Sequence, residues 1–489
     1  MNPPNPDPTW CCCCRREFLL TMGAAVGGLA WLSRTAAAAE PLGEAAPRPK
    51  PPATVRGAFL YPPSETLRKA GYWSWPGSTF DAEGRHKAYL EKILQMEKNL
   101  DMRIAMDEQP LDEPAQVARF IADVKESKPD GLLLIPFQKG HWPHVLRIIE
   151  ETKRPAVVLA TLGVLLSDHI RQLHGRAGVY LVSAADDLDA VAYGMKMIRT
   201  ACRMRDARIV NITGGEVKEV VVPGLETQVR TIPHARFVEL YRQTQADEPV
   251  RALADAYRKG ARAVVEPSAA DILDAAKTYF VFKRIVETEH ADAIMMECLT
   301  GLRHPRTHCP PCMGFMSLRD EGIPAGCQSD LSATLTLMLV QQLFDKPGFQ
   351  QNAAMDTERN LYFGSHCVSA SKMSGPAGPA EPYELRSHAE AGWGCVPRVL
   401  FPAGQELTLA QYRPVKTPEM LIYTGKVVEC PPIPPTGGCR SNVAMTINEC
   451  PDVCDVQGMH QIIFYGNEAK RLRAFCQMYG IPAASPHIS

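Results

Sequence analysis

Residues 131–161 read GLLLIPFQKGHWPHVLRIIEETKRPAVVLAT and contain two apolar runs on either side of an amphipathic stretch. The runs at 131–137 and 156–161 are short and rich in Leu, Ile and Val, which is typical of buried strands. Between them, residues 143–152 repeat apolar side chains at helical spacing. Strands separated by a helix predict a parallel sheet that helices cover on both faces.

The same alternation continues on both sides of this segment. The periodicity predicts further strands at 179–183, 209–213 and 291–297, and helices at 87–99, 115–126, 186–204, 248–259, 269–287, 311–321 and 329–344. We therefore expect an α/β fold with Rossmann-like parallel-sheet domains. The hydrophobic side chains of these runs are assigned to the core.

The pattern changes beyond about residue 375, where Pro and Gly become more frequent and a smaller β-rich carboxy-terminal module is expected. The strands predicted there lie at 398–401, 420–428, 442–447 and 460–465, before a last helix at 468–479. The predicted organisation is an export signal at 1–39, a Pro-rich linker at 40–54, α/β domains at 55–175 and 176–375, and the β-rich module at 376–489.

The amino terminus predicts export. Arg15 and Arg16 precede an apolar, Gly-rich run that is too short to span a bilayer, and Ala36–Ala39 supply a small-residue cleavage site. Paired arginines resemble the signal of the twin-arginine (Tat) pathway, which implies the Tat export machinery as a partner and a cargo that folds before export. An ordinary secretory signal is the alternative. Both interpretations place the mature chain in the periplasm or outside the cell.

Composition narrows the function classes. The chain has 53 Lys and Arg against 54 Asp and Glu, and it lacks the basic stripe of a nucleic-acid-binding protein. After residue 40 no apolar run reaches the ~18 residues that a membrane helix needs, so no stable membrane span is expected in the mature chain. A neutral or small polar ligand fits this composition best.

Twelve of the 16 cysteines lie at residue 202 or beyond. The candidates for disulfides in an oxidising compartment are Cys309, Cys312, Cys430, Cys439, Cys450 and Cys454. The spacings do not match a zinc site, because no second pair stands at a suitable distance. Disulfides or buried thiols are therefore expected.

Four polar residues lie at the ends of strand-like runs in the second half of the chain: Asp330, Asp356, His366 and His460. In parallel α/β sheets, ligands bind outside the carboxyl ends of the strands. Two carboxylates and two imidazoles are a suitable ligand set for a divalent ion of the manganese class. Each residue also has a structural explanation. Asp330 can cap a helix, Asp356 can form a turn, and either histidine can be a core residue.

A family resemblance unites these four residues. Residues 311–349 (PCMGFMSLRDEGIPAGCQSDLSATLTLMLVQQLFDKPGF) and 460–482 (HQIIFYGNEAKRLRAFCQMYGIP) resemble the carboxy-terminal catalytic part of the L-fucose and L-arabinose isomerases. In that family a carboxylate precedes the helix, a second acid and a histidine follow, and a histidine opens the last strand. The resemblance implies that Asp330, Asp356, His366 and His460 bind a divalent metal, most simply Mn²⁺.

One position departs from the family pattern. Many relatives have Glu directly after the cysteine that matches Cys327, whereas this chain has Gln328. Gln can hydrogen-bond a substrate hydroxyl, but it cannot take a proton or give charge to a metal. Glu297, at the end of the strand AIMME, is the residue that could replace the missing carboxylate. Glu297 can equally be a strand-end acid bonded to nearby backbone.

The resemblance implies an isomerase that converts an aldose to a ketose through an enediol. A metal would stabilise charge on the two sugar oxygens, while Asp330, Asp356 or Glu297 transfers the proton. A monosaccharide is the implied substrate, and a homo-oligomer with shared sites is the implied assembly.

Further substrate contacts are expected from Gln328, from Trp393 by stacking, and from His141 of a neighbouring subunit. Trp142, His144 and Lys139 are weaker candidates. The Gly214–Gly215 pair after a strand is expected to form a turn. A non-catalytic sugar-binding protein, or a pseudoenzyme on the same fold, is the alternative function.

Overall fold

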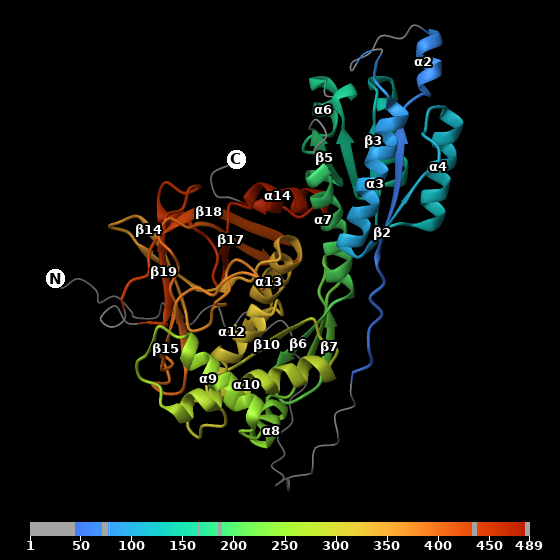
Figure 1. Cartoon of the computed structure of the whole chain (residues 1–489). Coiled ribbons are helices and arrows are strands. Elements are labelled where there is room, and N and C mark those ends of the chain that lie inside the picture. Colours follow the sequence, from blue (N-terminus) through green and yellow to red (C-terminus); the bar gives the residue numbers. More distant parts are fainter. Residues whose placement is uncertain are drawn as a thin grey trace, which may run out of the picture. The chain divides into compact units, whose positions relative to one another are not determined.

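The computed structural model describes residues 45–70, 77, 79–164, 166–183, 188–432 and 438–484 (Figure 1). These residues form a mixed α/β structure with a β-rich carboxy-terminal part, which confirms the predicted fold class. The predicted signal at 1–39, with Arg15 and Arg16, lies outside the described residues. Among the helices described, none combines the length and the apolar character that crossing a bilayer requires.

The first sheet, sheet A, is fully parallel and has the strand order β2-β1-β3-β4-β5. Its strands are β1 (Ala53–Leu60), β2 (Met102–Met106), β3 (Gly131–Pro136), β4 (Ala156–Ala160) and β5 (Val179–Ser183). The direction of the connections reverses between β1 and β3, as in doubly wound folds. Every residue of β3 and β4 is buried, which explains their uninterrupted apolar sequence.

Helices cover both faces of sheet A (Figure 1). The helices of this part are α2 (Ser64–Ala70), α3 (Ala82–Leu100), α4 (Pro114–Ser127), α5 (Trp142–Thr152), α6 (Ser167–Leu173) and α7 (Leu188–Asp206). Side chains of α4 and α5 pack on one face of the sheet, and side chains of α3 and α7 pack on the other.

The second sheet, sheet B, has the order β11-β10-β6-β8-β7, and only β7 is antiparallel to its neighbour. Its strands are β6 (Arg208–Ile212), β7 (Lys218–Val221), β8 (Gln228–Ile232), β10 (Ala293–Met296) and β11 (Ala325–Cys327). The helices around it are α8 (His234–Gln243), α9 (Glu248–Gly260), α10 (Ala269–Thr288), α11 (Leu299–Leu302), α12 (Cys312–Asp320) and α13 (Leu331–Phe344).

The carboxy-terminal part contains a largely antiparallel sheet of eight strands. Its strands are β12 (Phe349–Gln350), β13 (Asn352–Asp356), β14 (Leu361–His366), β17 (Glu406–Arg413), β18 (Glu419–Glu429), β19 (Ser441–Met445), β20 (Ile462–Tyr465) and β21 (Ala483–Ala484). A second, three-stranded sheet consists of β9 (Ala263–Val264), β15 (Tyr383–Arg386) and β16 (Val396–Val399).

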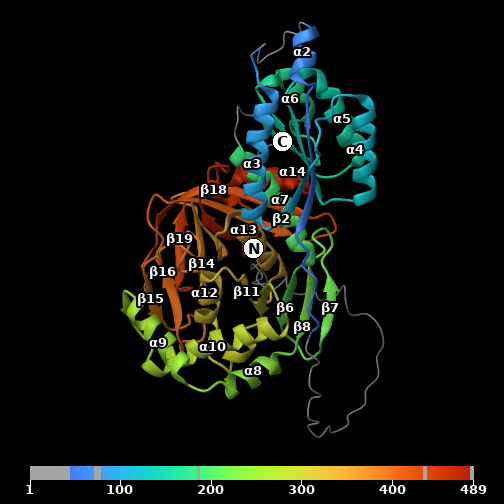
Figure 2. The same ribbon diagram turned by 45° about the vertical axis from the view of Figure 1, so that its right-hand side comes forward.

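Two helices connect sheet B to the β-rich part (Figure 2). On α12, Phe315 packs toward sheet B while Met313 and Met316 pack toward the β-rich strands. Helix α13 packs against Met295 of sheet B and against strands β17, β18 and β20. Because both helices are buried on several sides, the residues at their ends are held between two layers.

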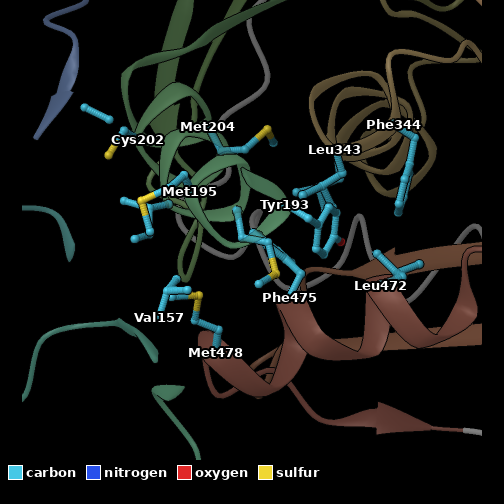
Figure 3. Close-up of a cluster of buried hydrophobic side chains, with 14 of the residues drawn as sticks. Val157, Tyr193, Met195, Cys202, Met204, Leu343, Phe344, Leu472, Phe475 and Met478 are labelled. Carbon is cyan, nitrogen blue, oxygen red and sulfur yellow. The ribbon is translucent and has the colours of Figure 1, made fainter. Parts of the chain in front are cut away.

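The last helix, α14 (Ala469–Met478), returns to sheet A and closes the largest core cluster (Figure 3). Tyr193 of α7 stacks on Phe344 of α13, and its hydroxyl donates to the carbonyl of Arg471. Gln477 donates to the carbonyls of Arg176 and Val179, beside β5.

The structure differs from the expected domain boundaries in three places. Strand β5 belongs to sheet A although it follows residue 175, and the hairpin β13–β14 joins the β-rich sheet before residue 375. Part of the expected Pro-rich linker is anchored, because Arg208 donates to the carbonyl of Ala46 and Lys50 pairs with Asp292.

Candidate functional site

The carboxyl ends of β10 and β11 lie side by side in sheet B. Met296 and Cys327 are register partners, so Glu297 and Gln328 follow at the same edge. The amide of Ser329 donates to the carbonyl of Met296, and the amide of Glu297 donates to Ile212 of β6. These bonds fix the backbone that carries Glu297, Gln328 and Asp330, while the Glu297 and Gln328 side chains stay partly exposed.

Asp330 and His460 are in direct contact. Asp330 precedes α13, and its Oδ1 accepts the amide of Ala333 at 2.8 Å as a helix cap. Its Oδ2 lies 2.8 Å from Nδ1 of His460, which precedes β20. Both carboxylate oxygens therefore have a partner. A carboxylate on one ring nitrogen of histidine orients the ring and leaves Nε2 for a ligand, as is common around metal-binding histidines.

His366 completes a cluster with His460. Their ring centroids are 5.6 Å apart, and His366, the last residue of β14, is almost fully buried. Neither ring nitrogen of His366 has a hydrogen-bond partner among the described residues. Burial lowers the pKa of His366 well below its ordinary value, and the nearby His460, Arg319 and His388 act in the same direction. His366 is therefore neutral at pH 7, which is the form that binds metals.

Strained backbone marks the same place. The φ angles of Gln328, Ser329 and His460 are 56°, 52° and 57°. These angles lie in the left-handed region, which residues other than Gly rarely adopt. Several of the other left-handed residues, such as Lys128, are helix C-caps, where this conformation is ordinary. Gln328 and Ser329 instead precede the N-cap of α13, and His460 precedes β20. Strained backbone of this kind is typical of functional sites.

Arg319 and Gln350 support this edge, and sequence reasoning missed both. The side-chain amide of Gln350 bonds both the N–H and the carbonyl of Cys327, at 2.9 and 3.1 Å, in the way a neighbouring strand would. Arg319 is fully buried and donates to the carbonyls of Ala325 and Gly348. An Arg inside the apolar stretch of α12 was the available signal, because arginine is almost never fully buried unless its polar groups are paired.

Asp356 does not join the cluster, so its assignment as a ligand and acid/base was wrong. It pairs with Leu361 at the turn of the β13–β14 hairpin, whereas His366 is at the other end of β14. Five residues along a strand span about 16 Å. The Oδ1 of Asp356 accepts the amide of Arg359, so Asp356 is a turn residue.

The remaining predicted contacts lie in two different places. Trp393 is partly buried beneath the guanidinium of Arg306, and its carbonyl accepts the amide of His388, one of the groups that face His366. His141 belongs to the edge of sheet A, where its Nε2 lies 2.9 Å from Asp112. The single chain therefore does not bring His141 to Asp330. Trp142 is buried in the core and donates to Gln172, which excludes stacking on a sugar.

The donor chemistry suits a divalent ion only in part. In the described part of the chain, no three His, Cys, Asp or Glu groups already converge as a metal site would require. The imidazoles of His366 and His460 do lie close together, both ring nitrogens of His366 lack a partner among the described residues, and Glu297 follows the neighbouring strand β10. Imidazole and carboxylate together are ligands for first-row divalent metals. The donors available near this edge are the imidazoles of His366 and His460, with the Glu297 carboxylate at the end of β10.

The chain matches no family model and no curated protein sequence. The likeness to sugar isomerases thus rests on the residues quoted above.

The cysteine pairs expected from spacing are not formed, since all twelve described cysteines are free thiols. The Sγ of Cys309 donates to the carbonyl of Asp274, and Cys430 contacts the backbone of Phe401. Cys450 is buried while Cys454 is exposed.

Proposed function

We propose that this chain is an exported, divalent-metal-dependent aldose–ketose isomerase that acts on a monosaccharide. The observation that carries the proposal is that His460 contacts both Asp330 and His366, although the three residues come from distant segments. Glu297 follows β10, the strand beside the one that leads to Asp330. Orphaned imidazole nitrogens and left-handed backbone at the same edge support a ligand there.

Each residue has a distinct role in this proposal. His366 and His460 would hold the ion with Glu297, and Asp330 orients the ring of His460. Glu297 is the group best suited to move a proton between the two adjacent carbons, since both oxygens of Asp330 are already engaged. Gln328 would hydrogen-bond a sugar hydroxyl. When bound, the ion would supply Lewis-acid stabilisation of negative charge on the sugar oxygens.

The compartment and assembly are part of the proposal. The paired arginines support export by the Tat machinery to the periplasm or beyond. Trp393 would contact the sugar within one chain, while His141 requires a neighbouring subunit and therefore a homo-oligomer.

Metal analysis and isotope exchange test the function. The purified protein is assayed for bound Mn²⁺ and then incubated with a panel of aldoses and ketoses in deuterated water. Solvent deuterium at C1 or C2 is the expected result, and Glu297→Gln should abolish it while Asp356→Asn leaves it unchanged. If no sugar exchanges with Mn²⁺ supplied, the chain is not an isomerase. Tight sugar binding without exchange would identify the alternative, a non-catalytic sugar-binding protein.

A further inference from the structure

Two buried thiols meet between the strands that carry the site. The Sγ atoms of Cys298 and Cys327 lie 3.6 Å apart, and each side chain is 2 % exposed. Cys298 directly follows Glu297, and Cys327 directly precedes Gln328. A link between the two sulfurs would therefore join the backbone segments on which the candidate site depends.

The pair lies in apolar surroundings, and the backbone of one of its members is held in place. Both cysteines belong to an apolar cluster that includes Cys312 and Cys367, with Cys439 packed against it. Cys327 is also held in place by Gln350, which bonds both of its backbone polar groups. Cys298 is the residue directly before the single-turn helix α11.

We propose that Cys298 and Cys327 form a disulfide when the protein resides in an oxidising compartment, and that this bond clamps the ends of β10 and β11. Two thiols lose two protons and two electrons to form the S–S bond. A disulfide-bearing oxidant, of the protein or small-molecule class, accepts them and is reduced to two thiols. This proposal can be tested whether or not the chain is an isomerase, because mass spectrometry detects the bond directly.

The pair Cys298 and Cys327 differs from the cysteine pairs that spacing in the sequence favoured. Cys309 and Cys312 are close in sequence, but their side chains belong to different core clusters. Cys298 and Cys327 are 29 residues apart in sequence, yet adjacent strands bring them together. The contact in the folded chain, and not the spacing in the sequence, therefore identifies Cys327 as the partner of Cys298.

Peptide mapping of the full chain tests the proposal. The purified protein is equilibrated with oxidised glutathione, denatured without reductant, treated with N-ethylmaleimide and digested. The expected product is one cross-linked peptide joining Cys298 to Cys327, lighter than the two thiol peptides by two hydrogen atoms and lost on reduction. Exposed Cys454, alkylated in every sample, is the internal control.

Two variants separate the bond from folding defects. Cys298→Ala should remove the cross-link and leave Cys327 open to alkylation after denaturation, whereas Cys202→Ala, at a buried cysteine elsewhere, should leave the cross-link intact. The oxidised protein should also unfold at a higher temperature than the reduced one, and Cys298→Ala should lose this shift. Alkylation of both thiols in the oxidised wild type, or a link between Cys367 and Cys439 in their place, would overturn the proposal.

Discussion

The Oδ2 atom of Asp330 lies 2.8 Å from Nδ1 of His460, although 130 positions separate the two residues in sequence. The other carboxylate oxygen of Asp330 caps helix α13. One side chain thus orients an imidazole and starts a helix, so its effect on the site and its effect on stability can be separated by mutation.

Asp330→Asn should keep the helix cap but lose the charge next to His460. Asn caps helices about as well as Asp, so the free energy of unfolding should change by less than about 1 kcal/mol. Loss of a carboxylate partner of a metal-binding histidine typically lowers metal affinity by about 10- to 100-fold. We expect this loss in a Mn²⁺ titration of Asp330→Asn.

The matched control is Asp247→Asn, since Asp247 caps α9 through the amide of Val250. It should leave Mn²⁺ affinity unchanged. Equal affinities for wild type and Asp330→Asn would show that the Asp330–His460 contact is only structural.

His366 should be dispensable for folding although it is buried. Its ring nitrogens lack partners among the described residues, and burying an unpaired polar group costs about 1–3 kcal/mol. His366→Leu should therefore unfold at the same or higher denaturant concentration than wild type, while metal binding and deuterium exchange are lost.

His388→Leu is the comparison for His366. Nδ1 of His388 accepts the amide of Ala391, so Leu at this position should destabilise the fold by leaving that amide unpaired. A large loss of stability in His366→Leu would mean that the ring has a structural partner and would remove it from the proposed site.

The left-handed backbone at Gln328 should lower the stability of the folded chain, and the Gln328 side chain should contribute to activity. Gln328→Gly should relieve the strain and stabilise the protein by about 1 kcal/mol, because Gly adopts φ = 56° without penalty. Activity should fall, since the side chain that would contact a sugar hydroxyl is gone. Chemical denaturation and deuterium exchange measure the two effects.

Lys128→Gly provides the matched backbone control. Lys128 is exposed, has a φ of 48° and ends α4, far along the chain from Gln328. Its replacement should give a similar gain in stability with unchanged activity. If Gln328→Gly retains full activity, the strain at Gln328 has no functional role.

Strands that are buried on both faces were the easiest elements to predict. The run at 131–137 matches β3 (Gly131–Pro136), because such strands have continuous apolar sequences. In contrast, all four residues of β7 are exposed, and its sequence, KEVV, does not alternate polar and apolar residues as a half-buried strand does. Strand β17 was also missed, although its middle is buried.

The residues of the candidate site were also only partly predictable from the sequence. Asp330 and His460 could be found because they lie next to apolar runs and because the family resemblance links the two segments that carry them. Asp356 was misplaced because its position depends on the register of the β13–β14 hairpin, which local sequence does not specify. Gln350 supports Cys327 through contacts between distant segments, which a single sequence does not contain.

Stability should fall as the pH drops below about 6.5, partly because of His308. His308 is 3 % exposed, its Nδ1 donates to the carbonyl of Cys309 and its Nε2 lies 3.2 Å from His234. Burial, with a further contribution from His234, lowers the pKa of His308 to about 4. Between these two pH values the unfolded chain binds a proton that the folded chain does not, so the free energy of unfolding decreases with acidification and levels off near pH 4. The contribution is roughly 3 kcal/mol.

His308→Asn keeps a donor for the carbonyl of Cys309 but removes the titrating ring. Its stability at pH 7 should be lower than that of wild type, because the ring packs against Phe237 and Gly301. Its loss of stability between pH 7 and pH 4.5 should nevertheless be smaller. His174→Asn, at an exposed histidine, should retain the full pH dependence. Urea unfolding at several pH values measures both, and an unchanged slope in His308→Asn would show that His308 is protonated alike in the folded and unfolded chains.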